Sequence, residues 1–329
     1  MIWGNIPGFY NSDSGGPRWG DCEIIQDDFG NVEIIDGYCG VGTTRLIKRL
    51  KEWKIKSPYL YITHAHYDHY YGIRKIINDG YFKPKALYCY DPKTLTAHTN
   101  AIQDNITALT AIIKEAKVKN IPVIYLKNGD KIQHGDIKFT VYRDQPKFTG
   151  NSDAYVNDGS LCFWFPEIKY LITGDAGLEV AKKNNLDPIV IKIGHHGNNC
   201  VRVMATWLKN HGCKFCWDND YNTKLTDFLM TGREDCLAVG MKYFNIHGDI
   251  NFVAFNGKVN IYKDGKISSY TCPYKGENKM KSATLQIVKA VLLGEYGSSN
   301  ERTTGLLADG FNPGSVQGWI NTLTKLIKG

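Results

Sequence analysis

The sequence predicts an α/β protein followed by a small helical module. Short apolar, β-branched and aromatic runs alternate with amphipathic stretches over the first 210 residues, which indicates strands alternating with helices. After a polar, Lys-rich stretch at 273–281, apolar residues recur at helical spacing. We therefore expect one large domain over 1–272, a linker over 273–281 and three short helices over 282–329.

The first half of the chain has the clearest alternation. Residues 1–20 are rich in Gly and aromatic residues, and we expect a surface lead-in there. The helix predicted at 43–54 places Leu46, Ile47, Leu50 and Trp53 on one face. The other elements predicted here are strands at 22–25, 32–35, 58–62 and 85–90, and helices at 70–78 and 95–119.

The second half reads as a further set of strands separated by Gly-Asp turns. Residues 151–158 are expected to form a polar loop, and 201–210 a helix. The predicted strands are 121–126, 131–132, 137–142, 160–165, 169–173, 189–193, 215–217, 252–262 and 269–272.

Composition places the chain among ordinary globular proteins. Its 329 residues are 43% hydrophobic and 22% charged, and a net charge of +7 suits a polyanionic substrate without identifying one. Nine Cys with no regular spacing argue against a disulfide framework, and Cys213 and Cys216 are expected to be buried thiols. We see no apolar run long enough to cross a membrane and no secretory signal.

The main chemical signal is Thr63-His64-Ala65-His66-Tyr67-Asp68-His69. Three imidazoles and a carboxylate follow a predicted strand, and alternate residues near a strand end point the same way, so His64 and His66 can bind one ion together. We expect the following loop to turn Asp68 and His69 toward a second position. Imidazole nitrogen with carboxylate oxygen is a zinc ligand set, with manganese or iron as alternatives.

Two later strands run straight into residues of the same chemical types. Asp175 follows the strand at 169–173, and His195 and His196 follow the strand at 189–193. A carboxylate between two cations can bridge them. His247, near the end of another apolar stretch, is a further ligand candidate, with a water-facing histidine as the alternative.

The spacing His-x-His-x-Asp-His resembles the signature of the metallo-β-lactamase-fold hydrolases. The resemblance implies an αββα sandwich with two divalent metal ions, the first held by His64 and His66 and the second by Asp68 and His69. Asp175 would bridge the ions, and one of His195 and His196 would bind the first.

The resemblance also implies that His247 completes the second position and that Asp36, after the strand at 32–35, supports the metal loop from behind. The alternative for Asp36 is a simple turn residue. The segments Asn-Asp-Gly-Ser-Leu, Leu-Ile-Thr-Gly-Asp and Ile-Lys-Ile-Gly-His-His-Gly are similar to one branch of that family. The branch includes hydrolase domains of bacterial DNA-uptake channels and teichoic-acid phosphorylcholine esterases.

The C-terminal module resembles a short wall-binding repeat of phage lysins. The similarity runs from Gly294-x-Tyr296-Gly297 through Arg302 and Gly310-Phe311 to Asn321. It implies binding of peptidoglycan, with Tyr296 and Arg302 as contact residues. The alternatives are a helical cap on the large domain or a homo-oligomerisation module.

These features together predict a metal-dependent cell-wall hydrolase of phage endolysin type, with Asp68 and Asp175 as catalytic carboxylates. Its substrate would be a peptidoglycan amide or a wall-polymer phosphodiester. We expect the protein to be synthesised in the cytoplasm without a signal peptide and to act at the cell wall after release. The alternatives are a metal-dependent nuclease or phosphodiesterase, with nucleic acid as substrate, and a binding protein whose metal site is degenerate.

Overall fold

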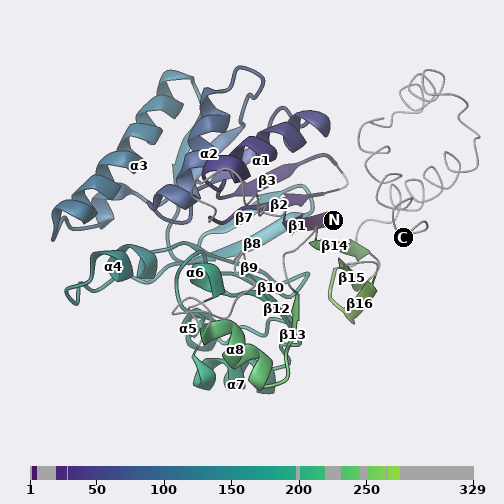
Figure 1. Ribbon diagram of the computed structural model, residues 1–329. Coiled ribbons are helices and arrows are strands. Elements are labelled where there is room, and N and C mark those ends of the chain that lie inside the picture. Colours follow the sequence, from purple (N-terminus) through teal and green to yellow (C-terminus); the bar gives the residue numbers. More distant parts are fainter. Residues whose placement is uncertain are drawn as a thin grey trace, which may run out of the picture.

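The computed structural model describes residues 2–5, 20–27, 29–197, 201–218, 231–244, 250–255, 257–263 and 266–274. Within these residues the strands form two sheets that lie against each other, and helices cover the outer face of each sheet (Figure 1). This is the predicted αββα sandwich, so the fold class is confirmed. The predicted three-helix module at 282–329 and most of the predicted linker lie outside the described residues.

The first sheet has nine strands in the order β16-β15-β14-β1-β2-β3-β4-β5-β6. The strands from β3 to β6 run parallel, and the rest of the sheet is antiparallel. Their bounds are β1 Ile2–Asn5, β2 Glu23–Gln26, β3 Val32–Ile35, β4 Tyr59–Tyr61, β5 Ala86–Cys89, β6 Val123–Tyr125, β14 Ile250–Phe255, β15 Lys258–Lys263 and β16 Lys266–Thr271.

The second sheet has seven strands in the order β13-β12-β11-β10-β9-β8-β7. Here β10 to β13 run parallel, whereas β7 to β10 pair antiparallel. Their bounds are β7 Lys131–His134, β8 Ile137–Tyr142, β9 Cys162–Phe165, β10 Tyr170–Ile172, β11 Val190–Lys192, β12 Phe215–Trp217 and β13 Lys242–Phe244.

The helices form the two outer layers. Figure 1 shows α1 (Gly40–Glu52), α2 (Tyr67–Asn78) and α3 (Asn100–Val118) above the first sheet, and α5 (Glu179–Lys183), α7 (Arg202–Asn210) and α8 (Thr231–Ala238) below the second. Three short elements lie between or beside these layers: η1 (Pro92–Thr94), α4 (Ser152–Asp158) and α6 (Gly194–Gly197). None of the helices in the described part of the chain is long and apolar enough to cross a membrane.

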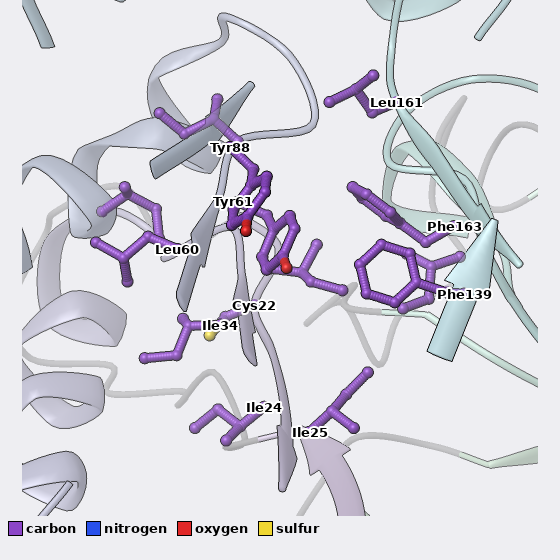
Figure 2. Packing of buried hydrophobic residues seen from close by; sticks show 14 of the residues in the cluster. Cys22, Ile24, Ile25, Ile34, Leu60, Tyr61, Tyr88, Phe139, Leu161 and Phe163 are labelled. Carbon is purple, nitrogen blue, oxygen red and sulfur yellow. The ribbon is translucent and has the colours of Figure 1, made fainter. Parts of the chain in front are cut away.

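The core between the sheets is aromatic. Tyr61 of β4 lies edge-on to Phe139 and Phe163 of the second sheet, with ring centroids 5.6 and 5.7 Å apart, and it stacks on Tyr88 at 4.6 Å. Figure 2 shows Leu60, the preceding residue, on the opposite side of the strand toward the helices. The strand therefore buries both of its faces, as a parallel strand covered by helices and by a second sheet must do.

Several predicted elements begin elsewhere than expected. Ile2–Asn5 is a strand between β2 and β14, not a lead-in, because Trp3 pairs with Ile25 on one side and Phe252 on the other. The predicted loop at 151–158 is helix α4, and the side chain of Asn151 caps its start by accepting from the Ala154 amide. The long helix α3 starts at Asn100, where Thr99 caps it, instead of at residue 95.

Helix α2 differs in the way that matters most for function. It starts at Tyr67, so Asp68 and His69 lie in its first turn instead of in a loop, which corrects the predicted start at residue 70. An acidic residue in the first turn stabilises a helix through the positive end of the helix dipole. The spacing of Asp68 and His69 is therefore fixed by helical geometry.

Candidate metal centre

Six of the predicted ligand residues meet at one end of the sandwich: His64, His66, Asp68, His69, Asp175 and His196. Asp36 follows β3 and His64 follows β4 in the first sheet, while Asp175 follows β10 and His196 follows β11 in the second. β3 runs parallel to β4, and β10 runs parallel to β11. The carboxyl ends of the two strands in each sheet therefore lie at the same edge. Both sheets therefore contribute side chains to one site, as is usual at the carboxyl ends of parallel strands.

His64, His66 and Asp175 form the first group of ligand atoms, with one atom from each within 4.8 Å of the others. Nε2 of His64 lies 3.0 Å from Nδ1 of His66 and 3.6 Å from Oδ2 of Asp175. His64 is fully buried and His66 partly exposed. These three residues offer a divalent ion two imidazole nitrogens and a carboxylate oxygen.

Asp68, His69 and His196 form the second group, again with one atom from each within 4.8 Å of the others. Nε2 of His196 lies 2.9 Å from Oδ2 of Asp68, and Nε2 of His69 lies 3.7 Å from the same oxygen. The Nε2 atom of His69 is buried and makes no hydrogen bond within the described residues. A buried polar atom without a hydrogen-bond partner needs an explanation, and binding of a metal ion supplies one.

Asp175 stands between the two groups. Its Oδ2 faces His64, and its Oδ1 lies 3.3 Å from Nε2 of His69. Each carboxylate oxygen thus points to a different group, which is the arrangement that a bridging ligand requires. The polypeptide fixes this position at Gly174, whose φ of +55° and contact with Thr63 leave no room for a Cβ.

Asp36 contacts the segment 63–69, which carries four of the predicted ligands. Its carboxylate accepts hydrogen bonds from the amide of Thr63 at 2.9 Å and from the hydroxyl of Thr63 at 2.7 Å. The same carboxylate lies 2.8 Å from Nδ1 of His69, which leaves Nε2 of that ring for a metal. Asp36 has a φ of 58°, an unusual conformation for a residue other than glycine.

The electrostatics of the cluster separate its histidines. Burial, followed by the neighbouring His69, holds the pKa of His64 well below its usual value, and burial also lowers the pKa of His66. Both rings are therefore neutral near pH 7, which is the form that binds metals.

The second group shows the opposite behaviour, because carboxylates outweigh the effect of burial there. Burial alone lowers the pKa of His196, but the hydrogen bond to Asp68 and the charges of Asp175 and Asp21 outweigh it and raise the pKa to about 9. The pKa of His69 is likewise raised, by Asp175, Asp36 and Asp68, against the effect of burial. A concentration of carboxylates that attracts protons in this way also attracts cations.

The structure distinguishes His196 from His195. Both residues have positive φ angles, and the turn they form directs His196 to Asp68, whereas His195 is half-buried and belongs to neither group. His196 lies with Asp68 and His69 and not with His64 and His66, where one of the pair was expected. His247, Tyr296 and Arg302 lie outside the described residues, so their predicted roles stay predictions.

Two residues that the sequence analysis did not single out belong to the centre. Asp21 is buried and forms a third group with His69 and Asp175, with ligand atoms within 4.8 Å of one another. Lys192, also buried, donates to the carboxylate of Asp21. The sequence signal for Asp21 is its position directly before the strand predicted at 22–25 and directly after the lead-in expected over 1–20.

Helix α4 lines the open side of the centre. Oδ1 of Asp153 lies 3.9 Å from Nε2 of His66, and the Asp153 side chain is 81% exposed. Asn157, one turn later on the same face of the helix, is buried, and its Oδ1 accepts no hydrogen bond within the described residues. One polar group of α4, the carboxylate of Asp153, therefore lies beside the first group of ligand atoms.

The residues present fit two divalent ions. The donors are imidazole nitrogens and carboxylate oxygens, which suit zinc, manganese and iron alike. Nε2 of His66, like that of His69, is buried and has no hydrogen-bond partner among the described residues. His64, His66 and Asp175 would hold one ion, and Asp68, His69 and His196 the other, with Asp175 between them.

No family model matches the sequence, and no curated protein matches it. Among solved structures, the rubredoxin:oxygen oxidoreductase of Desulfovibrio gigas has 18% identity and a TM-score of 0.32, over 47% of this chain and 32% of that one. The B3 metallo-β-lactamase BLEG-1 has 17% identity and a TM-score of 0.32, over 53% of this chain and 72% of that one. A variant of the CmlA β-hydroxylase has 13% identity and a TM-score of 0.43, over 76% of this chain and 53% of that one.

This chain thus spans only about a third of the length of the oxidoreductase that it matches. One fold hosts many reactions, so the reaction of this chain must be argued from its own site.

Proposed function

We propose that this protein is a metal-dependent hydrolase with a two-ion centre. The observation that carries the proposal is the position of Asp175, whose two oxygens face two separate groups of ligand atoms, one with His64 and one with His69. When bound there, two divalent ions supply Lewis acidity, which makes water nucleophilic near neutral pH and polarises the bond to be cleaved.

The chain's own residues prepare the site for that chemistry. Asp175 sets the separation of the two positions, and Asp36 holds the ring of His69 with Nε2 toward the centre. Among the described ligand residues, His64, His69 and Asp175 are buried, whereas the side chains of His66 and Asp68 are 19% and 21% exposed and give the centre an open side. A substrate would approach from that side, across α4.

We further propose a bacterial cell-wall polymer as the substrate, cleaved at a peptidoglycan amide or a wall-polymer phosphodiester. The support is the sequence resemblance of residues 294–321 to a wall-binding repeat. Such a module would raise the local concentration of the catalytic domain on an insoluble substrate. The second candidate is a nuclease or phosphodiesterase, which the net charge of +7 and the resemblance to DNA-uptake hydrolase domains favour.

Purified Gram-positive walls test the proposal directly. The full chain is loaded with zinc or manganese, incubated with walls and assayed for new amines, reducing ends and released phosphate esters. Asp68→Asn keeps the shape of the side chain but removes its charge, and we expect it to abolish product. His211→Gln is the control, because His211 is an exposed histidine that follows α7 and belongs to none of the three ligand groups.

The products separate the candidate functions. New amines that disappear in Asp68→Asn identify an amidase or peptidase, and released phosphate identifies a wall-polymer esterase. Cleavage of DNA without any product from walls would replace the wall hydrolase with the nuclease. Metal content well below one ion per chain after loading would contradict both and leave a binding protein.

A further inference from the structure

A buried ion pair lies directly behind the second group of ligand atoms. Asp21 and Lys192 are 2% and 1% exposed, and Nζ of Lys192 donates to Oδ2 of Asp21. The other oxygen of Asp21 lies 3.6 Å from Nδ1 of His196. Lys192 ends β11, four residues before His196, and Asp21 precedes β2, so the pair joins the two sheets at the metal centre.

A contribution to the stability of the fold is a weak explanation for a buried ion pair. Removing two charges from water costs several kcal/mol each, and the attraction between them often only offsets that cost. Burial lowers the pKa of Lys192, but Asp21, Asp175 and Glu23 outweigh it and keep the lysine protonated. Lys192 thus holds the carboxylate of Asp21, whose other oxygen is directed at a predicted ligand histidine.

The two groups of ligand atoms differ in what stands behind their histidines. In the second group, both Nδ1 atoms face buried carboxylates: Asp36 at 2.8 Å from His69, and Asp21 at 3.6 Å from His196. Asp36 lies within hydrogen-bond distance of His69, whereas Nδ1 of His196 makes no hydrogen bond within the described residues and Asp21 acts on it through its charge. A carboxylate behind a ligand histidine raises the basicity of the ligand nitrogen.

In the first group the supporting groups are neutral or exposed. Nδ1 of His64 meets the hydroxyl of Thr63 at 3.0 Å, and Nδ1 of His66 lies against the ring of His64. The carboxylate that faces His66 is that of Asp153, which is 3.9 Å away and largely exposed. Water screens such a charge, and an exposed side chain is not held in one orientation.

We propose that the position formed by Asp68, His69 and His196 binds its metal ion more tightly than the position formed by His64, His66 and Asp175. Asp21, held by Lys192, is the positioning residue that makes the difference together with Asp36. The inference rests on the two-ion centre of the proposed function but is independent of the substrate. It also assigns a role to the otherwise unexplained buried lysine.

Zinc titration of the full chain, stripped of metal and followed with a competing chromophoric chelator, tests this inference. We expect two ions per chain in two separate phases. Asp21→Asn should weaken the tighter phase by about 10- to 100-fold and leave the weaker phase in place. Glu33→Gln is the matched control, because Glu33 is also a buried carboxylate 2.8 Å from a histidine Nδ1, that of His134, but outside the three ligand groups.

A second measurement needs no variant and covers the case in which Asp21→Asn does not fold. Crystals of the stripped protein with one equivalent of zinc should show anomalous scattering beside His196 and not beside His64. An ion beside His64, equal occupancy of both positions, or an equal loss of affinity in Glu33→Gln would overturn the inference while leaving the hydrolase proposal intact. Binding of less than one zinc per chain would contradict both.

Discussion

Glu23 gives the protein a stability that depends on pH in a direction opposite to that of most carboxylates. The residue lies on β2, is 1% exposed and accepts a hydrogen bond from the hydroxyl of Tyr170 on β10. Burial raises its pKa from 4.5 to about 8, although Lys192 and Tyr170 lower it. The folded protein therefore keeps this carboxyl protonated at a pH at which the unfolded chain has ionised it.

The sign and size of the effect follow from proton linkage. Between pH 4.5 and 8 the folded state binds one more proton at Glu23 than the unfolded state, so this group's contribution to stability is lost as pH rises. A pKa that rises from 4.5 to about 8 corresponds to about 5 kcal/mol at about 1.4 kcal/mol for each pH unit. Between pH 5 and 7.5 the loss is about 3 kcal/mol.

Glu23→Gln removes the ionisation and keeps an oxygen that can accept from Tyr170. We expect the variant to gain stability relative to the parent by about 3 kcal/mol between pH 5 and 7.5. The free energy of unfolding is measured with urea at both pH values, in the presence of a chelator. Glu52→Gln, at the exposed end of α1, should show no such change. A difference between variant and parent that is constant with pH, or that moves the other way, would refute the reasoning.

Three further outcomes are expected. Asp36→Asn should lower zinc affinity by about 10- to 100-fold in a competition titration, because it weakens the contact with His69, whereas unchanged affinity would contradict a supporting role. Gly72→Ala should destabilise the protein by about 2 kcal/mol or more in a urea titration, because a Cβ at Gly72 would lie 1.7 Å from the carbonyl oxygen of Gly37 and push α2 away. Gly80→Ala is the control, because a Cβ at Gly80 meets only open space. Phe163→Ala should cost about 3–5 kcal/mol through the cavity left beside Tyr61, and a loss below about 1 kcal/mol would mean that this part of the core can collapse.

The parts of the fold that the sequence predicts are those with local signals. The run Tyr59–Ile62 consists of aromatic and aliphatic residues, and β4 ends shortly before the predicted ligands. The α1 and α7 helices lie close to their predicted positions, because apolar residues recur there at the spacing of a helix face. The ligand types after β10 and β11 were visible for the same reason, since each follows an apolar strand.

The misplaced parts depend on contacts between distant segments. β1 is a four-residue strand whose partner β14 begins at Ile250, so no local pattern marks it. The distinction between His195 and His196 depends on two consecutive positive φ angles, which side-chain types alone do not reveal. The role of Asp21 appears only when β2 and β11 are brought together, because its partners are Lys192 and His196.

The division of the centre between two sheets has a mechanical consequence. His64, His66, Asp68 and His69 come from one sheet, and Asp175 and His196 come from the other, more than a hundred residues further along the chain. Bound ions would therefore act as a reversible clasp between the halves of the sandwich. These ligands come together only after both halves have folded, so metal binding would stabilise the folded state. Loss of the ions would therefore lower the free energy of unfolding as well as remove activity.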